Sequence, residues 1–177
     1  MHDKFLKKYY FINSFDTNII NKQDKTTTFI YRDYESSEID TNKILKLKTF
    51  LKKRGNKFLL ANNFKIALKF KLDGVYLPSF NNKFDHLNYS TNSNFIILGS
   101  AHNLKEIKIK ETQKVQSIFI SSLFKKNNNF LGINKFKIIS RYSKKNIVAL
   151  GGISKKNIKK LRLLNISGFA GISFFEQ

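Results

Sequence analysis

Two adjacent glycines, Gly151 and Gly152, are the first feature of this sequence that suggests chemistry. They end a short apolar run at residues 147–150, and Ser154 follows them as a potential N-cap of a helix. A glycine turn at a helix start offers free N–H groups and the positive end of the helix dipole, which suits an anion and phosphate above all. The alternative interpretation is that the glycines only form a tight turn.

The segment around these glycines predicts a βαβ unit. Ile158, Leu161 and Leu164 fall on one side of a helix whose other side carries lysines. Residues 168–172 form a second apolar run, and the crossover makes the two predicted strands parallel. Residues 146–173 therefore predict a strand, a glycine turn, a helix and a second strand, with the ligand site at the turn.

Strand and helix patterns alternate in the same way along the rest of the chain. Such alternation predicts a parallel sheet, and eight strands favour a compact (β/α)8 TIM barrel of the α/β class over an open doubly wound sheet. A chain of 177 residues, 41% of them hydrophobic, can bury one core, so we expect a single domain over residues 1–177. The predicted strands are residues 8–13, 26–32, 57–61, 73–77, 95–99, 117–121, 147–150 and 168–172.

The predicted barrel is short, because barrels of this type typically have about 250 residues. The helical pattern after the first strand, at residues 16–24, is weak, and Gln177 lies only four positions after Ser173. We therefore expect shortened or missing helices near the first and last strands. The apolar patch left beside these strands would be covered by a second subunit of a homo-oligomer or by the N-terminal arm.

Composition restricts the class of protein. The chain has 33 Lys and Arg against 12 Asp and Glu, a net charge of +21 that is typical of nucleic-acid binders. The lysines accompany many Asn, Ile and Phe residues, which a genome rich in A and T would encode, and they are spread over the predicted helices. Nucleic-acid binding is therefore the less favoured interpretation. The absence of cysteine excludes disulfides and zinc fingers, and the scattered histidines leave oxygen ligands for any metal.

No targeting signal is apparent in the sequence. Residues 1–15 lack the apolar run of a signal peptide, and no segment approaches the roughly 20 apolar residues of a membrane span. We expect a cytoplasmic protein without membrane contact.

In a (β/α)8 barrel, chemistry takes place at the C-terminal ends of the strands, and the last two strands often hold a phosphate. Arg32, at the end of the predicted strand 26–32, could contact a phosphate through two N–H donors. Arg32 could instead pair with Asp33 or Glu35 on the surface, and we expect His102 to have a structural role at a helix start. The candidates just past the predicted strands are Arg32, Asn62, Asn63, Ser79, Asn81, Ser100, His102, Ser121, Ser122, Lys125, Lys126, Gly151, Gly152, Ile172 and Ser173.

The order of four motifs resembles the thiamine phosphate synthase family, including its thiazole tautomerase relatives. These motifs are LDGVYL, ILGSAHNLKE, VALGGI and GFAGIS, and the resemblance covers nearly the whole chain. It implies a (β/α)8 barrel and a transferase that joins hydroxymethylpyrimidine diphosphate to thiazole phosphate, giving thiamine phosphate and pyrophosphate with the help of Mg²⁺. The implied partners are small phosphorylated substrates.

The resemblance implies roles for individual residues. Gly151 and Gly152 match the family's GGI turn, which binds the thiazole phosphate, as does the final IS pair of the family. The chain has this pair at Ile172 and Ser173. The lysine of a further substrate-binding loop has two loose counterparts, Lys125 and Lys126.

The pyrophosphate side of the family's site is matched in part. Ser100 and His102 stand in its SxH pattern near the pyrophosphate. Arg32 matches the arginine of its Gln-x-Arg-x-Lys motif, and Asn62 matches the asparagine of its Asn-Asp pair. The resemblance thus implies Arg32, Asn62 and Ser100 as catalytic residues and His102 as a substrate-binding residue.

Other family positions differ in this chain. Ile30 and Tyr34 replace the glutamine and lysine around the motif's arginine, and Asn63 and Asn81 stand where the family has two magnesium carboxylates. Two negative charges are therefore lost from the metal site. Two hypotheses follow: a divergent synthase in which diphosphate and water carry the metal, or a non-catalytic or repurposed paralogue that binds a phosphorylated thiazole-type ligand.

Overall fold

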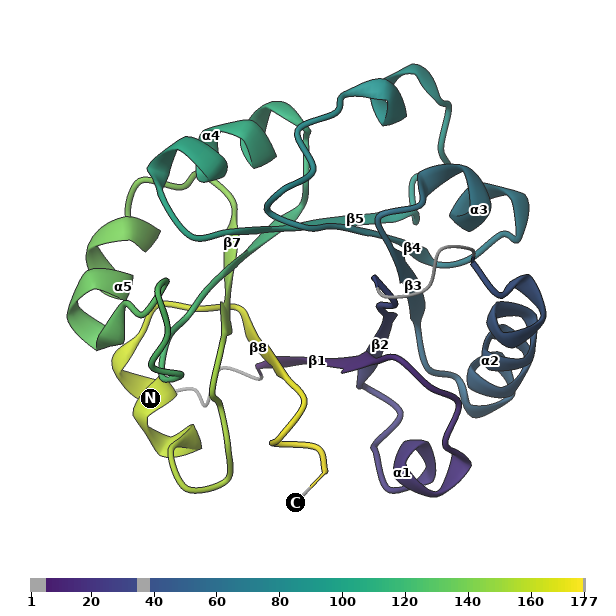
Figure 1. Cartoon of the computed structure of the whole chain (residues 1–177), viewed down its shortest axis with the longest axis horizontal. Coiled ribbons are helices and arrows are strands. Elements are labelled where there is room, and N and C mark those ends of the chain that lie inside the picture. Colours follow the sequence, from purple (N-terminus) through teal and green to yellow (C-terminus); the bar gives the residue numbers. More distant parts are fainter. Residues whose placement is uncertain (1–5, 35–38, 177) are drawn as a thin grey trace.

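The computed structural model describes residues 6–34 and 39–176, which form a closed barrel of eight parallel strands (Figure 1). Each strand pairs with its neighbours in sequence, and the last strand pairs with the first to close the ring. The predicted (β/α)8 barrel is confirmed. The strands are β1 (Lys7–Ile12), β2 (Thr28–Tyr31), β3 (Phe58–Ala61), β4 (Gly74–Leu77), β5 (Ile96–Ala101), β6 (Ser117–Ile120), β7 (Asn146–Leu150) and β8 (Gly168–Gly171).

Helices of unequal length cover the outside of the barrel. Asp40 caps the longest helix through its side chain, and Gly55 ends it with a φ of 78°. In the described part of the chain no helix is both long enough and apolar enough to cross a membrane. The helices are α1 (Thr17–Asn21), α2 (Thr41–Arg54), α3 (Phe64–Lys69), α4 (Leu104–Thr112) and α5 (Gly132–Ser140), with the 3-10 helices η1 (Asp85–Asn88) and η2 (Ile158–Leu163).

The connection between β7 and β8 differs from the α-helix predicted there. Its only helical part is η2, which begins after Asn157 without a side-chain cap. Asn157 accepts a hydrogen bond from the Ser154 N–H at 3.0 Å and donates one to the Gly152 carbonyl at 2.8 Å. This asparagine side chain competes with helical bonding and stabilises a turn in its place. The predicted cap by Ser154 is therefore wrong.

The interior of the barrel is a packed core. Its aromatic rings meet edge to face, with 4.9 Å between the centroids of Tyr9 and Phe119 and 5.1 Å between those of Phe11 and Tyr76. Side chains fill the interior, so a ligand cannot bind inside the barrel, and in this fold active sites lie at the C-terminal ends of the strands. The buried hydrophobic residues of this interior cluster, among the described residues, are Tyr9, Phe11, Ile30, Leu59, Ala61, Tyr76, Leu98, Phe119, Val148 and Ala170.

The C-terminal segment covers the outer face of β1 and β8, where no described helix follows β8 (Figure 1). The ring of Phe175 stacks on Tyr10 with 4.8 Å between centroids and on Phe169 with 6.1 Å. The Tyr10 hydroxyl donates to a Glu176 carboxylate oxygen at 3.0 Å, and the Gln23 amide donates to the Phe175 carbonyl at 2.9 Å. The short α1 and the missing last helix agree with prediction.

The prediction of an exposed apolar patch beside these strands is wrong, because the side chains of Tyr10, Phe169 and Phe175 are buried. The chain itself supplies the cover that we expected from a second subunit. The N-terminal arm, the other predicted cover, lies outside the described residues.

Removing the ring of Phe175 should destabilise the barrel. Phe175→Ala leaves a cavity against Tyr10 and should lower the free energy of unfolding by about 3 kcal/mol, as for other buried Phe→Ala changes. Phe84→Ala, at a phenylalanine that is 41% exposed, is the matched control and should cost less than about 1 kcal/mol. Urea unfolding measures both, and equal losses in the two variants would contradict the covering role.

Candidate active site

Arg32 lies at the barrel mouth, directly after β2 and above the aromatic interior. Its guanidinium carbon is 4.9 Å from the Phe11 ring centroid and 5.8 Å from that of Tyr34. These cation–π contacts hold the guanidinium by its face and leave its in-plane N–H donors for an anion. Among the described residues Arg32 forms no ion pair, and the alternative pairing with Glu35 lies outside them.

A cavity of about 320 Å³ adjoins Arg32 and brings distant parts of the sequence together. Ile172, directly after β8, lines the cavity together with residues of the neighbouring strand β1 and residues 32–34, which follow β2. The structure thus places two predicted site residues, Arg32 and Ile172, at one cavity, and the neighbouring Ser173 is exposed.

Three asparagines line a second cavity of about 210 Å³ at the ends of β3 and β4. The Asn81 amide donates to the Asn62 side-chain oxygen at 2.7 Å. Asn62 has a φ of 57°, a left-handed conformation that asparagine tolerates better than most residues. Asn63 accepts a hydrogen bond from the Ile66 N–H at 2.9 Å and so caps α3. This capping role of Asn63 was not predicted from the sequence.

These amide positions do not fit a magnesium ion held by the protein. The side-chain oxygen of Asn63 is used in the helix cap, and that of Asn81 accepts from the Lys83 N–H at 3.0 Å. Asp85 is the one carboxylate among the described residues that line the cavity. Within residues 6–34 and 39–176 no group of three acidic, His or Cys side chains could hold a metal. Carboxylates are the usual protein ligands of Mg²⁺, so the described residues at this cavity lack the expected set.

Ser100 and His102 occupy different environments. Ser100 was predicted to lie just past its strand. This position is wrong, because β5 continues to Ala101 and Ser100 is buried within it. Burial raises the pKa of Tyr76 to about 12, and a hydrogen bond from Ser100 opposes that rise. His102 remains at the rim, where its Nδ1 is 3.0 Å from a Glu106 carboxylate oxygen that also accepts the His102 N–H at 2.7 Å. These contacts agree with the structural role expected for His102.

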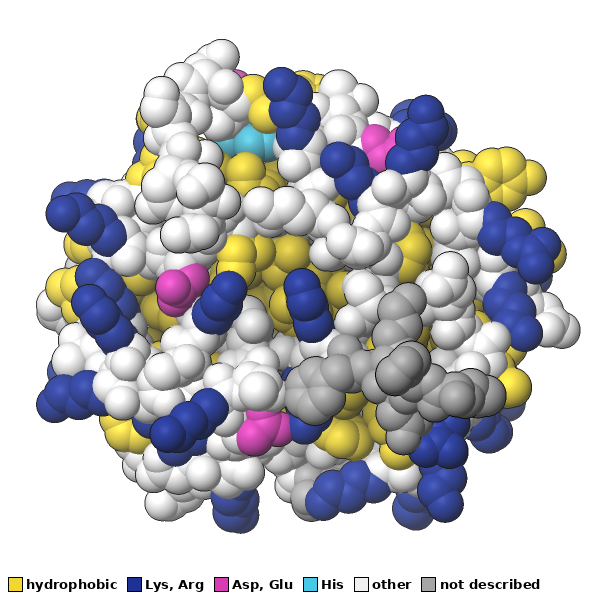
Figure 2. Space-filling model, turned by 180° about the vertical axis from the view of Figure 1, so that it is seen from behind, with side chains coloured by type: hydrophobic (Ala, Val, Ile, Leu, Met, Phe, Trp, Pro, Cys, Tyr) yellow, Lys and Arg dark blue, Asp and Glu magenta, His cyan; other side chains and the backbone are white. Residues whose placement is uncertain are grey.

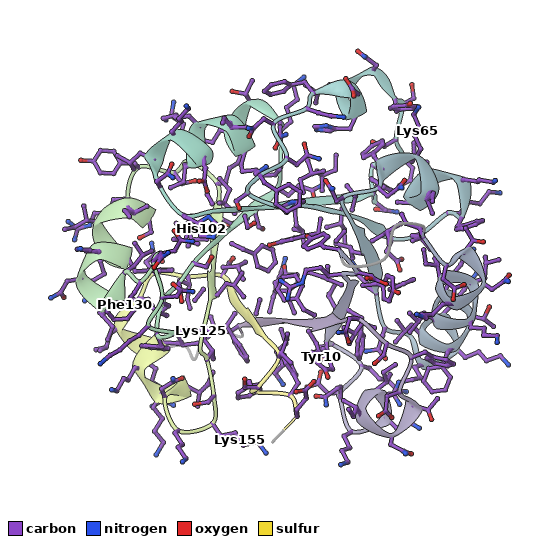
Figure 3. The ribbon with its side chains drawn as sticks, in the orientation of Figure 1. Tyr10, Lys65, His102, Lys125, Phe130 and Lys155 are labelled. Carbon is purple, nitrogen blue, oxygen red and sulfur yellow. The ribbon has the colours of Figure 1, made fainter. Side chains whose placement is uncertain are left out.

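The glycine turn after β7 holds the β6–α5 loop against the barrel. Gly151 and Gly152 have φ angles of 101° and 71°, and the Gly151 carbonyl accepts from the Phe124 N–H at 2.8 Å. A Cβ on Gly152 would lie 2.5 Å from the backbone nitrogen of Lys125. Lys125 and Lys126 are exposed, and Figure 3 shows Lys125 on the same side of the barrel as His102. The glycines therefore permit a close backbone approach, which the tight-turn interpretation anticipated only in part.

A comparison with known protein families identifies the fold's relatives. Residues 17–175 match the family model described as thiamine monophosphate synthase. The chain belongs to the thiamine monophosphate synthase family. The match spans β2 to β8 and the whole of the second cavity, and it agrees with the motif order in the sequence. Residues 10–14, Asp16 and Glu176 of the first cavity lie outside it.

Individual relatives of the thiamine monophosphate synthase family are similar at modest identity. A thiamine-phosphate synthase of Methanococcus vannielii is 34% identical over 82 residues, which are 44% of this chain and only 40% of that protein. A thiamine-phosphate synthase of Limosilactobacillus reuteri is 22% identical over 83% of this chain and 73% of its own length. Among solved structures, a thiamine phosphate pyrophosphorylase from Pyrococcus furiosus matches 98% of this chain and 92% of its own, with a TM-score of 0.77 and 19% identity.

The aromatic support of the mouth was not predicted from the sequence. Tyr34 meets Phe80 edge to face at 5.4 Å, and Phe11 lies under the guanidinium of Arg32. The strand period places Phe11 on the interior face with Tyr9, which was the available signal. The meeting of Tyr34 with Phe80 joins two loops and has no local signature.

The close approach at Gly152 predicts a difference between two glycines of similar backbone angle. Gly152→Ala should cost about 1 to 3 kcal/mol more of unfolding free energy than Gly55→Ala, because a methyl group at Gly152 collides with Lys125. Gly55 has a φ of 78°, and a methyl group there would meet nothing within 4 Å, so it reports backbone strain alone. Denaturant unfolding of both variants checks this difference, and equal costs would rule out the collision.

Proposed function

We propose that the chain is a thiamine phosphate synthase-like transferase, which joins hydroxymethylpyrimidine diphosphate to thiazole phosphate. The observation that carries this proposal is the cavity shared by Arg32 and Ile172, in a chain of this family. The guanidinium of Arg32 can bind a phosphate through its N–H donors, in a cavity that Asp16, Asp33 and Glu176 also line. The exposed Ser173 follows Ile172 directly in the sequence and offers a second contact for an anionic substrate.

In the proposed reaction the bond between the pyrimidine methylene carbon and the diphosphate oxygen breaks. Pyrophosphate leaves with the electron pair, and the thiazole nitrogen attacks the resulting pyrimidine cation to form the new C–N bond. Arg32 would stabilise the charge of the leaving pyrophosphate. The turn at Gly151 and Gly152 and the backbone at Ser173 would hold the thiazole phosphate, so that both reactants are oriented at one mouth. Mg²⁺ enters this scheme only as a counter-ion of the free diphosphate.

The second candidate is a paralogue that binds a phosphorylated thiazole-type ligand without transfer. The hydrogen bonds that occupy the side chains of Asn63 and Asn81 favour it, because these are the positions of the family's carboxylates. Nucleic-acid binding has less support: Lys and Arg are scattered over the face in Figure 2 and do not gather in one patch.

A turnover assay separates these candidates. Purified protein supplied with both substrates and Mg²⁺ should release pyrophosphate and form thiamine phosphate, with Arg32→Met at least about tenfold slower because leaving-group charge is no longer stabilised. Binding of thiazole phosphate without any turnover would favour the paralogue. An affinity for nucleic acid of arbitrary sequence that falls steeply with salt would favour nucleic-acid binding as the function.

A negative charge after β8 should weaken phosphate binding. Ser173→Asp should lower the affinity for thiazole phosphate at least about tenfold through like-charge repulsion at the mouth. Ser90→Asp, at an exposed serine in the η1–β5 loop, adds the same charge elsewhere and should leave the affinity unchanged. Isothermal titration calorimetry measures both, and an unchanged affinity in Ser173→Asp would remove the phosphate from this end of the mouth.

A further inference from the structure

Lys110 is a buried lysine on α4 that none of the assignments above uses. Its side chain is fully buried, and its ammonium group donates three hydrogen bonds. The acceptors are the carbonyl of Pro78 at 2.8 Å, the carbonyl of Asn81 at 2.7 Å and the side-chain oxygen of Gln113 at 2.9 Å. Two of these acceptors belong to the loop that follows β4 at the barrel mouth.

The barrel wall is shaped to admit this side chain. A Cβ on Gly99, in β5, would lie 2.7 Å from Cδ of Lys110 and 3.2 Å from a methyl group of Val115. The absence of a side chain at Gly99 therefore provides the space through which the lysine stem reaches the loop. A glycine on the strand and a lysine on the following helix act together.

The charge of Lys110 is not matched by a carboxylate. All three hydrogen-bond acceptors are neutral, and burial lowers the pKa of Lys110 to about 8, against a smaller opposing effect of Glu106. Glu106, one turn earlier on α4, is bonded to His102. Burying an ammonium group is costly, and an apolar side chain of similar length would fill the same space without that cost. The hydrogen bonds to the loop are what a lysine adds here.

The network continues from Lys110 to the candidate site. Gln113 donates to the carbonyls of Asn81 at 3.0 Å and Lys83 at 2.8 Å. The backbone carbonyl of Gln113 is 2.9 Å from Nε2 of His86, further along the same loop. Asn81, fixed through its backbone, then donates its side-chain amide to Asn62. The helix outside the barrel thus determines where the two amides lie at the mouth.

We propose that Lys110 is a positioning residue for the diphosphate side of the mouth: by fixing the backbone of residues 78–81 it holds Asn81 against Asn62. The identity of the ligand rests on the proposed function. Thiazole phosphate, on the opposite side at β7 and β8, does not depend on this network. Loss of the ammonium group therefore affects the two ligands unequally.

Lys110→Met tests this role, because methionine keeps an unbranched apolar stem and removes the three donors. Inorganic pyrophosphate should bind at least tenfold more weakly to this variant, whereas thiazole phosphate should bind within about twofold of the unmodified chain. Lys105→Met, at an exposed lysine on the same helix, is the matched control and should change neither affinity. An unchanged pyrophosphate affinity, or an equal loss of both ligands, would overturn the proposal.

Hydrogen exchange tests the same role independently of the ligand. In Lys110→Met the backbone amides of Asn81 and Lys83, which donate to Pro78 and Asn81, should exchange at least tenfold faster, with the amides of β5 unchanged. Loop exchange equal to that of Lys105→Met would overturn the proposal. If the unmodified chain binds neither ligand, the proposed function fails, and this measurement alone decides the role of Lys110.

Discussion

The packing of aromatic rings inside the barrel is the constraint on which the site depends. The rings come from β1, β4 and β6, no two of which are neighbours in the barrel. The edge-to-face contacts of Tyr9, Phe11, Tyr76 and Phe119 fill the interior between these strands. A filled interior excludes a ligand from inside the barrel, and active sites of this fold lie at the C-terminal ends of the strands. Phe11 serves both purposes, because its ring belongs to the core and its upper face supports the guanidinium of Arg32. A change in the core would therefore also move the guanidinium of Arg32, to which the proposed reaction assigns the leaving pyrophosphate.

The two sides of the mouth are built in different ways. At β7 and β8 the structure depends on backbone groups, with Gly151 accepting from the loop and Gly152 allowing its approach. At β3 to β5 it depends on side chains, which are the asparagines and the network of Lys110. Backbone N–H and carbonyl groups persist when most side chains change, whereas a carboxylate is lost in a single substitution. The side at β7 and β8 therefore requires a glycine at position 152, whereas the side at β3 to β5 depends on the identity of its polar side chains.

The fold was predictable from the sequence because each strand carries its own signal. The runs at β5 and β6 are apolar and bounded by polar residues, and the alternation with helices determines the topology. The features that sequence analysis missed are those in which residues distant in sequence meet. Phe175 covers β1, Tyr34 meets Phe80, and Lys110 reaches Pro78 past a glycine on another element. The α-helix predicted after β7 does not form for a local reason. The side chain of one residue, Asn157, competes with the helical hydrogen bonds.

The closure of the ring has a consequence for how the chain folds during its synthesis. β1 pairs with β8, and the hydrogen bond between Tyr10 and Glu176 joins residues 166 positions apart. During synthesis the edge of β1 that pairs with β8 therefore stays unpaired until nearly all the other described residues have left the ribosome. Contacts of such long range slow folding, and an open strand edge invites association with other chains. The edge of β1 that pairs with β8 is therefore open to other chains until the last strand is in place, a hazard that a helical bundle of equal length does not have.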